Sequence, residues 1–279
     1  MTKNLLILRP IYSILRNISV MTAKFGLLGH PLGHSFSKKF HNERFLTLGI
    51  DAVYENYDLA DVNDLVKVLG EEKQLMGLNV TIPYKQDVMR FLDELDPVAE
   101  KIGAVNVVKI GHIDESSPLW GKTKIEGLYL KGYNSDIIGF TESIRPMLRP
   151  THRKALILGT GGASKAIKVA LENMGIETKY VSRTKGEGRL TYGELTPGLI
   201  DEYKVIVNCS PLGMYPKTDQ CPDIPYDCLT AEHVCFDVVY NPETTLFMKK
   251  AQAKGASVKC GYEMLVGQAI ASYEIWTSH

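Results

Sequence analysis

Apolar residues occur along the chain both in short unbroken runs and at helical spacing, and these two patterns together predict alternating strands and helices. Residues 155–158 form a short unbroken apolar run, which is typical of a strand buried on both faces. After the glycines that follow, apolar residues recur at helical spacing as far as Met174, and Gly175 stands where a helix C-cap belongs. This stretch therefore predicts a strand, a tight turn and a helix.

The same patterns continue on both sides of that stretch. They predict strands at 24–29, 52–59, 76–81, 178–181, 205–209 and 234–239, and helices after Ser37, at 62–69, from about Asp136 and up to Trp276. Such alternation is typical of a parallel α/β sheet. Residues 109–131 are richer in Gly, Lys, Glu and Ser and predict an extended hairpin or surface excursion. The connection from Thr184 to Val205 is short for a full crossover helix, so we expect that helix to be reduced or missing.

Composition narrows the class of protein. With 279 residues, 44% hydrophobic and 23% charged, the chain is an ordinary globular protein, long enough for two domains. Acidic and basic residues balance at 32 each, so neither a nucleic-acid surface nor a membrane-binding patch is indicated. The five cysteines are odd in number and form no Cys-x-x-Cys pair, which favours reduced thiols in a cytoplasmic protein and argues against a zinc site.

The first twenty residues differ from the rest of the chain. Their two apolar runs are interrupted by Arg9-Pro10 and Arg16-Asn17, and no acidic residue occurs before Glu43. Neither run is long enough to span a bilayer, and the segment lacks the long apolar core of a signal peptide. We interpret residues 1–20 as an extension, with a transit peptide as the alternative, and expect the folded domain to begin after Met21.

The glycine turn after residue 158 is a candidate anion site. Gly159, Gly161 and Gly162 allow a tight turn and let backbone N–H groups approach a bound anion, most often the pyrophosphate of a dinucleotide. The match to the usual fingerprint is imperfect, because its third small residue falls at Ser164.

The next predicted strand indicates which dinucleotide is bound. It ends in Ser182-Arg183-Thr184-Lys185, where NAD sites usually carry an acidic residue. A guanidinium with neighbouring hydroxyls suits a 2′-phosphate instead, so we favour NADP over NAD. The alternative is that Arg183 and Lys185 belong to an ordinary solvated loop.

Polar residues in the first half suggest a second site. Ser35 and Ser37 lie in a Gly/Pro turn before a helix, where hydroxyls either hold a carboxylate or simply cap the helix. His30 and His34 have the spacing of a helical metal pair, but Pro31 and Gly33 make that helix unfavourable, so we reject a metal there.

More polar residues follow the third predicted strand. Asn79 and Thr81 are two apart on it and should face the same way, and Lys85 follows at its carboxyl end, where α/β ligand sites form. Asn106 is isolated in an apolar segment, so its amide must be hydrogen-bonded to a loop or a ligand. Asp136 lies near the start of a helix, where capping alone is the commoner role.

Taken together, these stretches resemble the shikimate dehydrogenase family from about Phe25 to Trp276. The motifs that carry the resemblance are 34–37 (HSFS) with 41–42 (HN), 79–85 (NVTIPYK), 103–106 (GAVN), 132–136 (GYNSD), 159–163 (GTGGA), 182–184 (SRT), 208–214 (NCSPLGM), 237–242 (DVVYNP) and 261–268 (GYEMLVGQ). Two positions depart from the family pattern. Lys38 replaces its usual proline, and Ser182 stands where asparagine is common.

The resemblance implies a function and a set of site residues. It implies NADPH-dependent reduction of 3-dehydroshikimate to shikimate, in aromatic amino acid biosynthesis, with Lys85 and Asp136 as the proton-transfer pair. Substrate-binding residues would be Ser35 and Ser37 for the carboxylate and Asn79, Thr81, Asn106 and Gln268 for the ring hydroxyls. Cofactor-binding residues would be Gly159, Gly161, Gly162, Ala163, Ser182, Arg183, Thr184, Met214, Tyr240, Gly261 and Met264.

We therefore expect two α/β domains and a small-molecule substrate. Residues 21–135, completed by the C-terminal helix 261–279, would bind the substrate, and residues 136–260 would form a Rossmann-like, doubly wound NADP domain. No nucleic-acid, membrane or metal partner is expected, and the protein would be a cytoplasmic monomer or homodimer. The alternatives are a quinate/shikimate dehydrogenase that uses NAD, and a catalytically silent nucleotide-sensing module.

Overall fold

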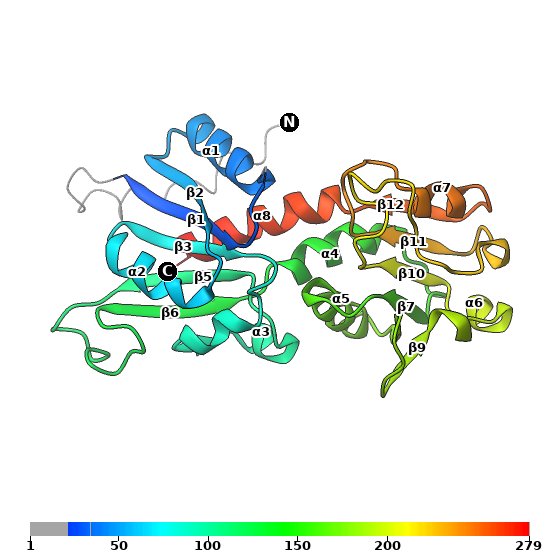
Figure 1. Cartoon of the computed structure of the whole chain (residues 1–279), viewed down its shortest axis with the longest axis horizontal. Coiled ribbons are helices and arrows are strands. Elements are labelled where there is room, and N and C mark those ends of the chain that lie inside the picture. The colour runs from blue at the N-terminus through cyan, green and yellow to red at the C-terminus, as the bar shows by residue number, and fades with distance from the viewer. Residues whose placement is uncertain (1–21, 34, 279) are drawn as a thin grey trace. The chain divides into compact units, whose positions relative to one another are not determined.

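A computed structural model describes residues 22–33 and 35–278 (Figure 1). The predicted extension 1–20 and His34 lie outside these described residues. The chain divides into two compact units. The first comprises residues up to Leu95, Val107–Tyr133 and the C-terminal segment from Ser272, and the second comprises Asp96–Asn106 and Asn134–Ala271.

The first unit is built on a mixed six-stranded sheet of order β2-β1-β3-β5-β6-β4. Its elements are β1 (Ala23–Gly29), α1 (Phe36–Leu48), β2 (Ala52–Asp58), the 3₁₀ turn η3 (Val62–Asp64), α2 (Leu65–Glu71), β3 (Leu75–Val80), the 3₁₀ turn η4 (Asp87–Phe91), β4 (Glu94–Leu95), β5 (Val107–His112) and β6 (Leu128–Tyr133). β1 pairs in parallel with β2 and β3, but β5 is antiparallel to both β3 and β6. The expectation of a parallel sheet therefore holds only for β1, β2 and β3, because β5 pairs antiparallel with β3. Residues 109–131 form the connection of an antiparallel hairpin, one of the two alternatives predicted for them.

An aromatic cluster packs α1 and the end of α8 (Tyr262–Thr277) onto one face of this sheet. Phe45, Tyr54 and Trp276 belong to it and are buried. The indole of Trp276 lies directly over β3, where a Cβ on Gly77 would come within 2.3 Å of the ring, and its N–H donates to the carbonyl of Val108 at 3.1 Å. The C-terminal helix is therefore fastened to this sheet by both packing and a hydrogen bond.

The second unit has an all-parallel sheet of order β12-β11-β10-β7-β8-β9. Its elements are α3 (Pro97–Ile102), α4 (Asp136–Ile144), η5 (Arg145–Met147), β7 (Lys154–Leu158), α5 (Gly162–Asn173), β8 (Glu177–Ser182), β9 (Arg189–Thr191), η6 (Tyr192–Glu194), α6 (Pro197–Glu202), β10 (Val205–Asn208), η7 (Tyr226–Cys228), β11 (Val234–Asp237), α7 (Leu246–Gln252), β12 (Ser257–Cys260) and the first part of α8. The predicted strand, turn and helix at 155–173 are confirmed. The crossover after β8 is reduced as expected, to a six-residue helix.

Helices cover both faces of this parallel sheet. α4 and α5 pack on one face, where Phe140 and Ile167 meet Ile157, and α6 and α7 pack on the other, where Ile200 and Phe247 are buried (Figure 1). Alternate residues of each strand therefore face opposite apolar layers. The carboxyl ends of the parallel strands all lie at one edge of the sheet.

Contacts divide the chain at different places from the predicted domain limits. Residues 96–106 pack into the second unit, because Ile102 and Ala104 share an apolar cluster with Ile157. The helix predicted to complete the first domain is shared, since Tyr262 to Ala271 belongs to the second unit and Ser272 begins the first. The assignment of substrate and cofactor to separate domains stays a prediction.

Candidate active site

The glycine turn after β7 leads into the N-terminus of α5. Gly159 has φ of +109°, a left-handed value that favours glycine, and a side chain there would also approach the backbone of Cys209. Gly161 is the N-cap of α5 and no side chain caps this helix end, whose first turn contains Gly162 and Ala163. A Cβ on Gly161 would meet nothing within 4 Å. The geometry fits a pyrophosphate, because N–H groups at a helix N-terminus attract anions.

The turn after β8 presents the side chains that were predicted to select the cofactor. Ser182 is buried at the strand end, and its Oγ accepts a hydrogen bond from the backbone N–H of Thr184, 3.2 Å away. Arg183 lies between them and is exposed. An accessible guanidinium with two neighbouring hydroxyls can form charge-assisted hydrogen bonds with a phosphate.

A buried hydrogen-bond network joins the ends of β10 and β11. The carboxylate of Asp237 accepts from the amide of Asn208 at 2.9 Å and from the hydroxyl of Thr245 at 2.6 Å. It also accepts from the backbone N–H of Val239 at 3.0 Å. Burial raises the pKa of Asp237 to about 6, although the three hydrogen bonds favour the charged form. The network holds the turns that follow both strands.

Four more predicted cofactor residues follow β10, β11 and β12. Met214 and Tyr240 are 46% and 40% exposed in the turns after the first two strands. Gly261 approaches the chain so closely that a Cβ would lie 2.1 Å from the carbonyl oxygen of Val238. Met264, in contrast, is buried in the apolar cluster of the second unit. Met214 and Tyr240 are therefore accessible and Gly261 lies in a tight turn, whereas the Met264 side chain packs in the core.

The start of α4 carries a cluster of polar side chains. The amide of Asn106 donates to Oδ1 of Asp136 at 2.8 Å and to Oγ of Ser135 at 3.0 Å. The Ser135 hydroxyl lies 3.5 Å from Oε1 of Gln268 and donates to it. The expectation that the buried Asn106 amide is hydrogen-bonded is confirmed. Within the second unit, the structure brings together Asn106, Asp136 and Gln268, which come from three distant parts of the chain.

Two glycines let α4 and α8 cross closely enough to build this cluster. A Cβ on Gly139 would lie 2.4 Å from the carbonyl oxygen of Met264 and 2.8 Å from the backbone nitrogen of Gln268. A Cβ on Gly267 would lie 3.1 Å from the Cα of Gly139. The backbones therefore touch, and this contact places Gln268 beside Ser135. The sequence pattern did not assign this role to either glycine.

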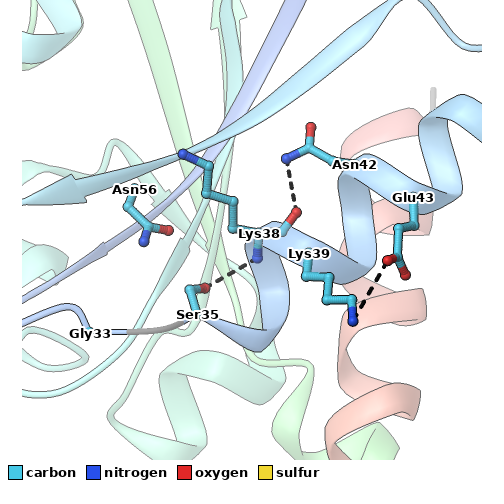
Figure 2. A pocket seen from close by; sticks show the side chains of 7 residues that line it. All are labelled: Gly33, Ser35, Lys38, Lys39, Asn42, Glu43 and Asn56. Carbon is cyan, nitrogen blue, oxygen red and sulfur yellow. Dashed lines mark hydrogen bonds and ion pairs between the residues drawn. The ribbon is translucent and has the colours of Figure 1, made fainter.

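In the first unit, Ser35 and Ser37 lie at the start of α1. Ser35 is the N-cap, and its Oγ accepts from the backbone N–H of Lys38 at 3.1 Å. Capping, one of the two predicted roles, is thus present, and binding a carboxylate stays a prediction. An open pocket borders this helix end, and Figure 2 shows the Lys38 side chain extending away from the ion pair of Lys39 and Glu43. The pocket is lined by Gly33, Ser35, Lys38, Lys39, Asn42, Glu43 and Asn56.

Asn79 is buried near the end of β3 and is hydrogen-bonded on both sides of its amide. Its Oδ1 accepts from the hydroxyl of Tyr54 at 2.8 Å, and its Nδ2 donates to Oγ of Ser272 at 2.8 Å. Neither Tyr54 nor Ser272 was predicted to take part in a site. No local pattern indicates them, because their partner lies on a different element.

Thr81 and Lys85 follow β3 rather than lie on it. The strand ends at Val80, one residue before its predicted end, so the shared orientation of Asn79 and Thr81 stays a prediction. Thr81 still donates its backbone N–H to the carbonyl of Leu28 at 2.9 Å. Lys85 is half-buried in the turn before η4. Lys85 belongs to the first unit and Asp136 to the second, so their action as a pair stays a prediction.

His30 has a role in the loop that was considered for a metal. Its Nδ1 lies 2.7 Å from Oδ1 of Asp58, and Oδ2 of Asp58 accepts the backbone N–H of Leu32 at 3.0 Å. Within residues 22–33 and 35–278, no group of three or more His, Cys, Asp or Glu side chains is placed to hold a metal ion. The described helices also include none long and apolar enough to cross a membrane.

The architecture of the second unit identifies the class of protein. Its sheet is parallel, helices cover both faces, and a glycine turn precedes α5. This is a Rossmann-like dinucleotide-binding architecture. A sequence model of the shikimate dehydrogenase substrate binding domain matches residues 27–108. Shikimate dehydrogenase (NADP(+)) from Methanosphaera stadtmanae is 35% identical over 271 residues, which cover 90% of each chain. The chain belongs to the shikimate dehydrogenase family.

Solved structures agree with this assignment. A chorismate mutase/shikimate 5-dehydrogenase fusion protein from Clostridium acetobutylicum has a TM-score of 0.77 at 33% identity, covering 92% of each chain. Shikimate 5-dehydrogenase from Thermus thermophilus, in complex with NADP(H) and shikimate, has a TM-score of 0.73 at 30% identity, covering 91% of this chain and 93% of that one.

Proposed function

We propose that the chain is an NADP-dependent oxidoreductase that interconverts 3-dehydroshikimate and shikimate, a step in the biosynthesis of aromatic amino acids. One observation carries the proposal. Similarity to a shikimate dehydrogenase (NADP(+)) extends over 90% of both chains, so both the substrate half and the cofactor half of such an enzyme are represented. The similar structure that holds NADP(H) and shikimate together supports the same pair of ligands.

The residues proposed to bind the substrate are polar side chains, some in the first unit and some in the second. Ser35 and Ser37 at the start of α1 would hold the substrate carboxylate, because hydroxyls and N–H groups at a helix start stabilise an anion. The ring hydroxyls would be bound by the residues that offer both donors and acceptors, which are Asn79, Thr81, Asn106 and Gln268. Buried amides suit this task, since their surroundings fix which end donates and which accepts.

The proposed chemistry places proton transfer on Lys85 and Asp136. Bound NADPH supplies the hydride that reduces the C3 carbonyl. The oxygen of that carbonyl gains negative charge as the reaction proceeds, and the Lys85 ammonium would give it a proton. Asp136, held by Asn106 at 2.8 Å, would orient the reacting hydroxyl.

The proposed cofactor site lies at the carboxyl edge of the parallel sheet in the second unit. The pyrophosphate would lie before α5, at Gly159, Gly161, Gly162 and Ala163, where the helix end is uncapped and the space is open. Arg183, with Ser182 and Thr184, would bind the 2′-phosphate. The turns with Met214 and Tyr240, and the close approach at Gly261 before Met264, would complete the site on the nicotinamide side.

The proposal extends to the compartment and the assembly. All five cysteines are free thiols in the structure, which supports the reducing environment of the cytoplasm. We propose a monomer or a homodimer, which sedimentation at several concentrations distinguishes.

The proposal is tested by oxidation of shikimate and of quinate, each with NADP and with NAD, followed at the absorbance of the reduced nicotinamide. We expect turnover of shikimate with a strong preference for NADP. Faster turnover of quinate with NAD would replace the proposal by the quinate/shikimate alternative. Binding of NADP without turnover of either substrate would favour a nucleotide-sensing module.

A further inference from the structure

Tyr54 on β2 is held by residues of α1 at both its backbone and its ring. The side-chain amide of Asn42 on α1 makes two hydrogen bonds to the backbone of Tyr54. Its Oδ1 accepts the N–H of Tyr54, and its Nδ2 donates to the carbonyl of Tyr54, both at 2.9 Å. The ring of His41 stacks on the phenol ring, with centroids 4.6 Å apart and planes inclined by 13°. Tyr54 is fully buried. Neighbouring residues of α1 thus fix both its backbone and its ring.

The hydroxyl of Tyr54 meets two residues of the proposed substrate site. It donates its only proton to Oδ1 of Asn79 at 2.8 Å, and the hydroxyl of Ser37 is also hydrogen-bonded to it. Because the amide NH₂ of Asn79 donates to Ser272, the oxygen of that amide faces Tyr54 and its nitrogen faces α8. The phenol therefore contacts both residues, and together with Ser272 it fixes how the amide of Asn79 is turned.

Two other tyrosines of the same unit provide the contrast. The hydroxyls of Tyr57, three residues along the same strand, and of Tyr273 on α8 are buried, and neither has a hydrogen-bond partner among the described residues. Burial of a tyrosine in this unit therefore does not by itself bring its hydroxyl to a polar side chain. Tyr54 differs in that its hydroxyl reaches Ser37 and Asn79.

We propose that Tyr54 is a positioning residue, which orients Ser37 and Asn79 for the substrate carboxylate and a ring hydroxyl. This inference rests on the proposed function of those two residues. Its physical reason is preorganisation: binding groups whose orientation is set before the ligand arrives lose less freedom on binding. Without the phenol proton, the amide of Asn79 would lose its acceptor bond and could turn over, presenting oxygen where nitrogen is required.

The test compares Tyr54→Phe with Tyr57→Phe, a matched loss of a buried hydroxyl from the same strand. We expect Tyr54→Phe to raise the KM for shikimate roughly three- to tenfold, the effect of one hydrogen bond. The KM for NADP should stay within about twofold, because a positioning effect is confined to one ligand. Tyr57→Phe should leave both constants unchanged. Equal effects of the two variants, or equal rises in both constants, would overturn the inference.

A double-mutant cycle with Asn79→Ala tests whether Tyr54 affects the KM for shikimate through Asn79. If Tyr54 acts through Asn79, the additional effect of Tyr54→Phe should largely disappear in the Asn79→Ala background. A purely structural role of Tyr54 would instead give additive losses, which would contradict the inference.

A readout independent of activity separates this inference from the proposed function. In the ¹⁵N-labelled protein, the side-chain NH₂ signals of Asn79 should move in Tyr54→Phe and stay in place in Tyr57→Phe. Unmoved signals would refute the positioning role even in an active enzyme. An inactive wild type that shows the expected shifts would count against the proposed function only. Should Tyr54→Phe fail to fold, slow exchange of the Asn79 NH₂ protons in the wild type is expected, and fast exchange would refute the role.

Discussion

The two sheets of this molecule differ in strand direction, and the difference decides how each half of the candidate site is built. In the second unit every strand is parallel, so the turns after β7, β8, β10 and β11 meet at one edge. In the first unit the sheet is mixed, and its polar residues come from α1, β2, β3 and α8. A parallel sheet gathers polar turns by topology alone, whereas the mixed sheet depends on individual side-chain contacts.

Hydrogen bonds within the two halves show the same difference. Asn208 and Asp237 lie at the ends of adjacent paired strands and bond directly across that pair. Asn79 and Ser272 are 193 positions apart in sequence and meet only because α8 is fastened to the first sheet by Trp276. The first arrangement follows from strand order, and the second follows from the packing of the last helix.

The largest expected effect tests whether both units supply catalysis. Lys85→Ala in the first unit and Asp136→Asn in the second should each lower kcat for shikimate oxidation by roughly 10²–10⁴, the usual contribution of a positioned acid–base group. Steady-state kinetics measures kcat, and calorimetry measures the affinity for shikimate. A variant that loses affinity in proportion to rate, with kcat preserved, would contradict the proposed role of that residue. Lys67→Ala, on the exposed side of α2, is the control and should retain kcat.

The second effect concerns the pH dependence of the parallel unit. The folded pKa of Asp237 is about 6 and its ordinary value is 3.8, so the native state binds more protons between these values. The free energy of unfolding should therefore fall as pH rises from about 4 to above 6. At about 1.4 kcal/mol per pKa unit, this one group accounts for roughly 3 kcal/mol.

Asp237→Asn removes this titration and is sterically conservative. Its oxygen can still accept from Asn208 and Val239, and its NH₂ can donate to the hydroxyl of Thr245. Urea unfolding of both proteins at pH 4, 5, 6 and 7 should give curves whose separation grows in favour of the variant as pH rises. A constant separation would show that Asp237 does not titrate in this range.

The third effect tests the close helix crossing in the second unit. Gly139→Ala places a methyl group 2.4 Å from a backbone oxygen of α8, so it should cost about 1–3 kcal/mol of unfolding free energy and weaken substrate binding through displaced Gln268. Gly70→Ala in α2 is the matched control, because a Cβ there meets nothing within 4 Å. In that helix alanine should stabilise by about 0.5–1 kcal/mol. Equal melting temperatures for the two variants would contradict the crossing geometry.

The smallest expected effect tests which residue of the second unit selects NADP over NAD. Arg183→Ala should reduce the preference for NADP over NAD by about tenfold, through loss of charge-assisted hydrogen bonds. Arg153→Ala, just before the amino end of β7 and so at the opposite edge of the sheet, should leave the preference unchanged. The ratio of kcat/KM for the two cofactors measures both. An unchanged ratio in Arg183→Ala would move the selection of cofactor to another residue.

Much of the parallel unit could be predicted because its signals are local. The apolar run, the glycine turn and the helical spacing after residue 158 each depend on neighbouring residues, and the structure has them as β7, Gly159 and α5. The network around Asp237 was missed, although a single acidic residue in the apolar run 234–239 is a signal, since a buried carboxylate requires hydrogen-bond partners.

The expectations for the first unit that differ from the structure concern features that depend on pairing between distant elements. Strand direction after β3 depends on which elements pair across the sheet, and the alternation of apolar residues does not encode it. The end of β3 at Val80 likewise follows from pairing, so Thr81 fell outside the strand on which it was expected.

By itself, the sequence determined the α/β class, the dinucleotide turn, the family resemblance and the residue types available for chemistry. These depend on short-range backbone preferences and on hydrophobic periodicity, which neighbouring residues carry. Only the tertiary structure decided that Tyr54 donates to Asn79, that Gly139 and Gly267 bring Gln268 beside Ser135, and that Asp237 is buried among three donors. Such contacts join elements far apart in the chain, and their geometry exists only once the helices and sheets have packed.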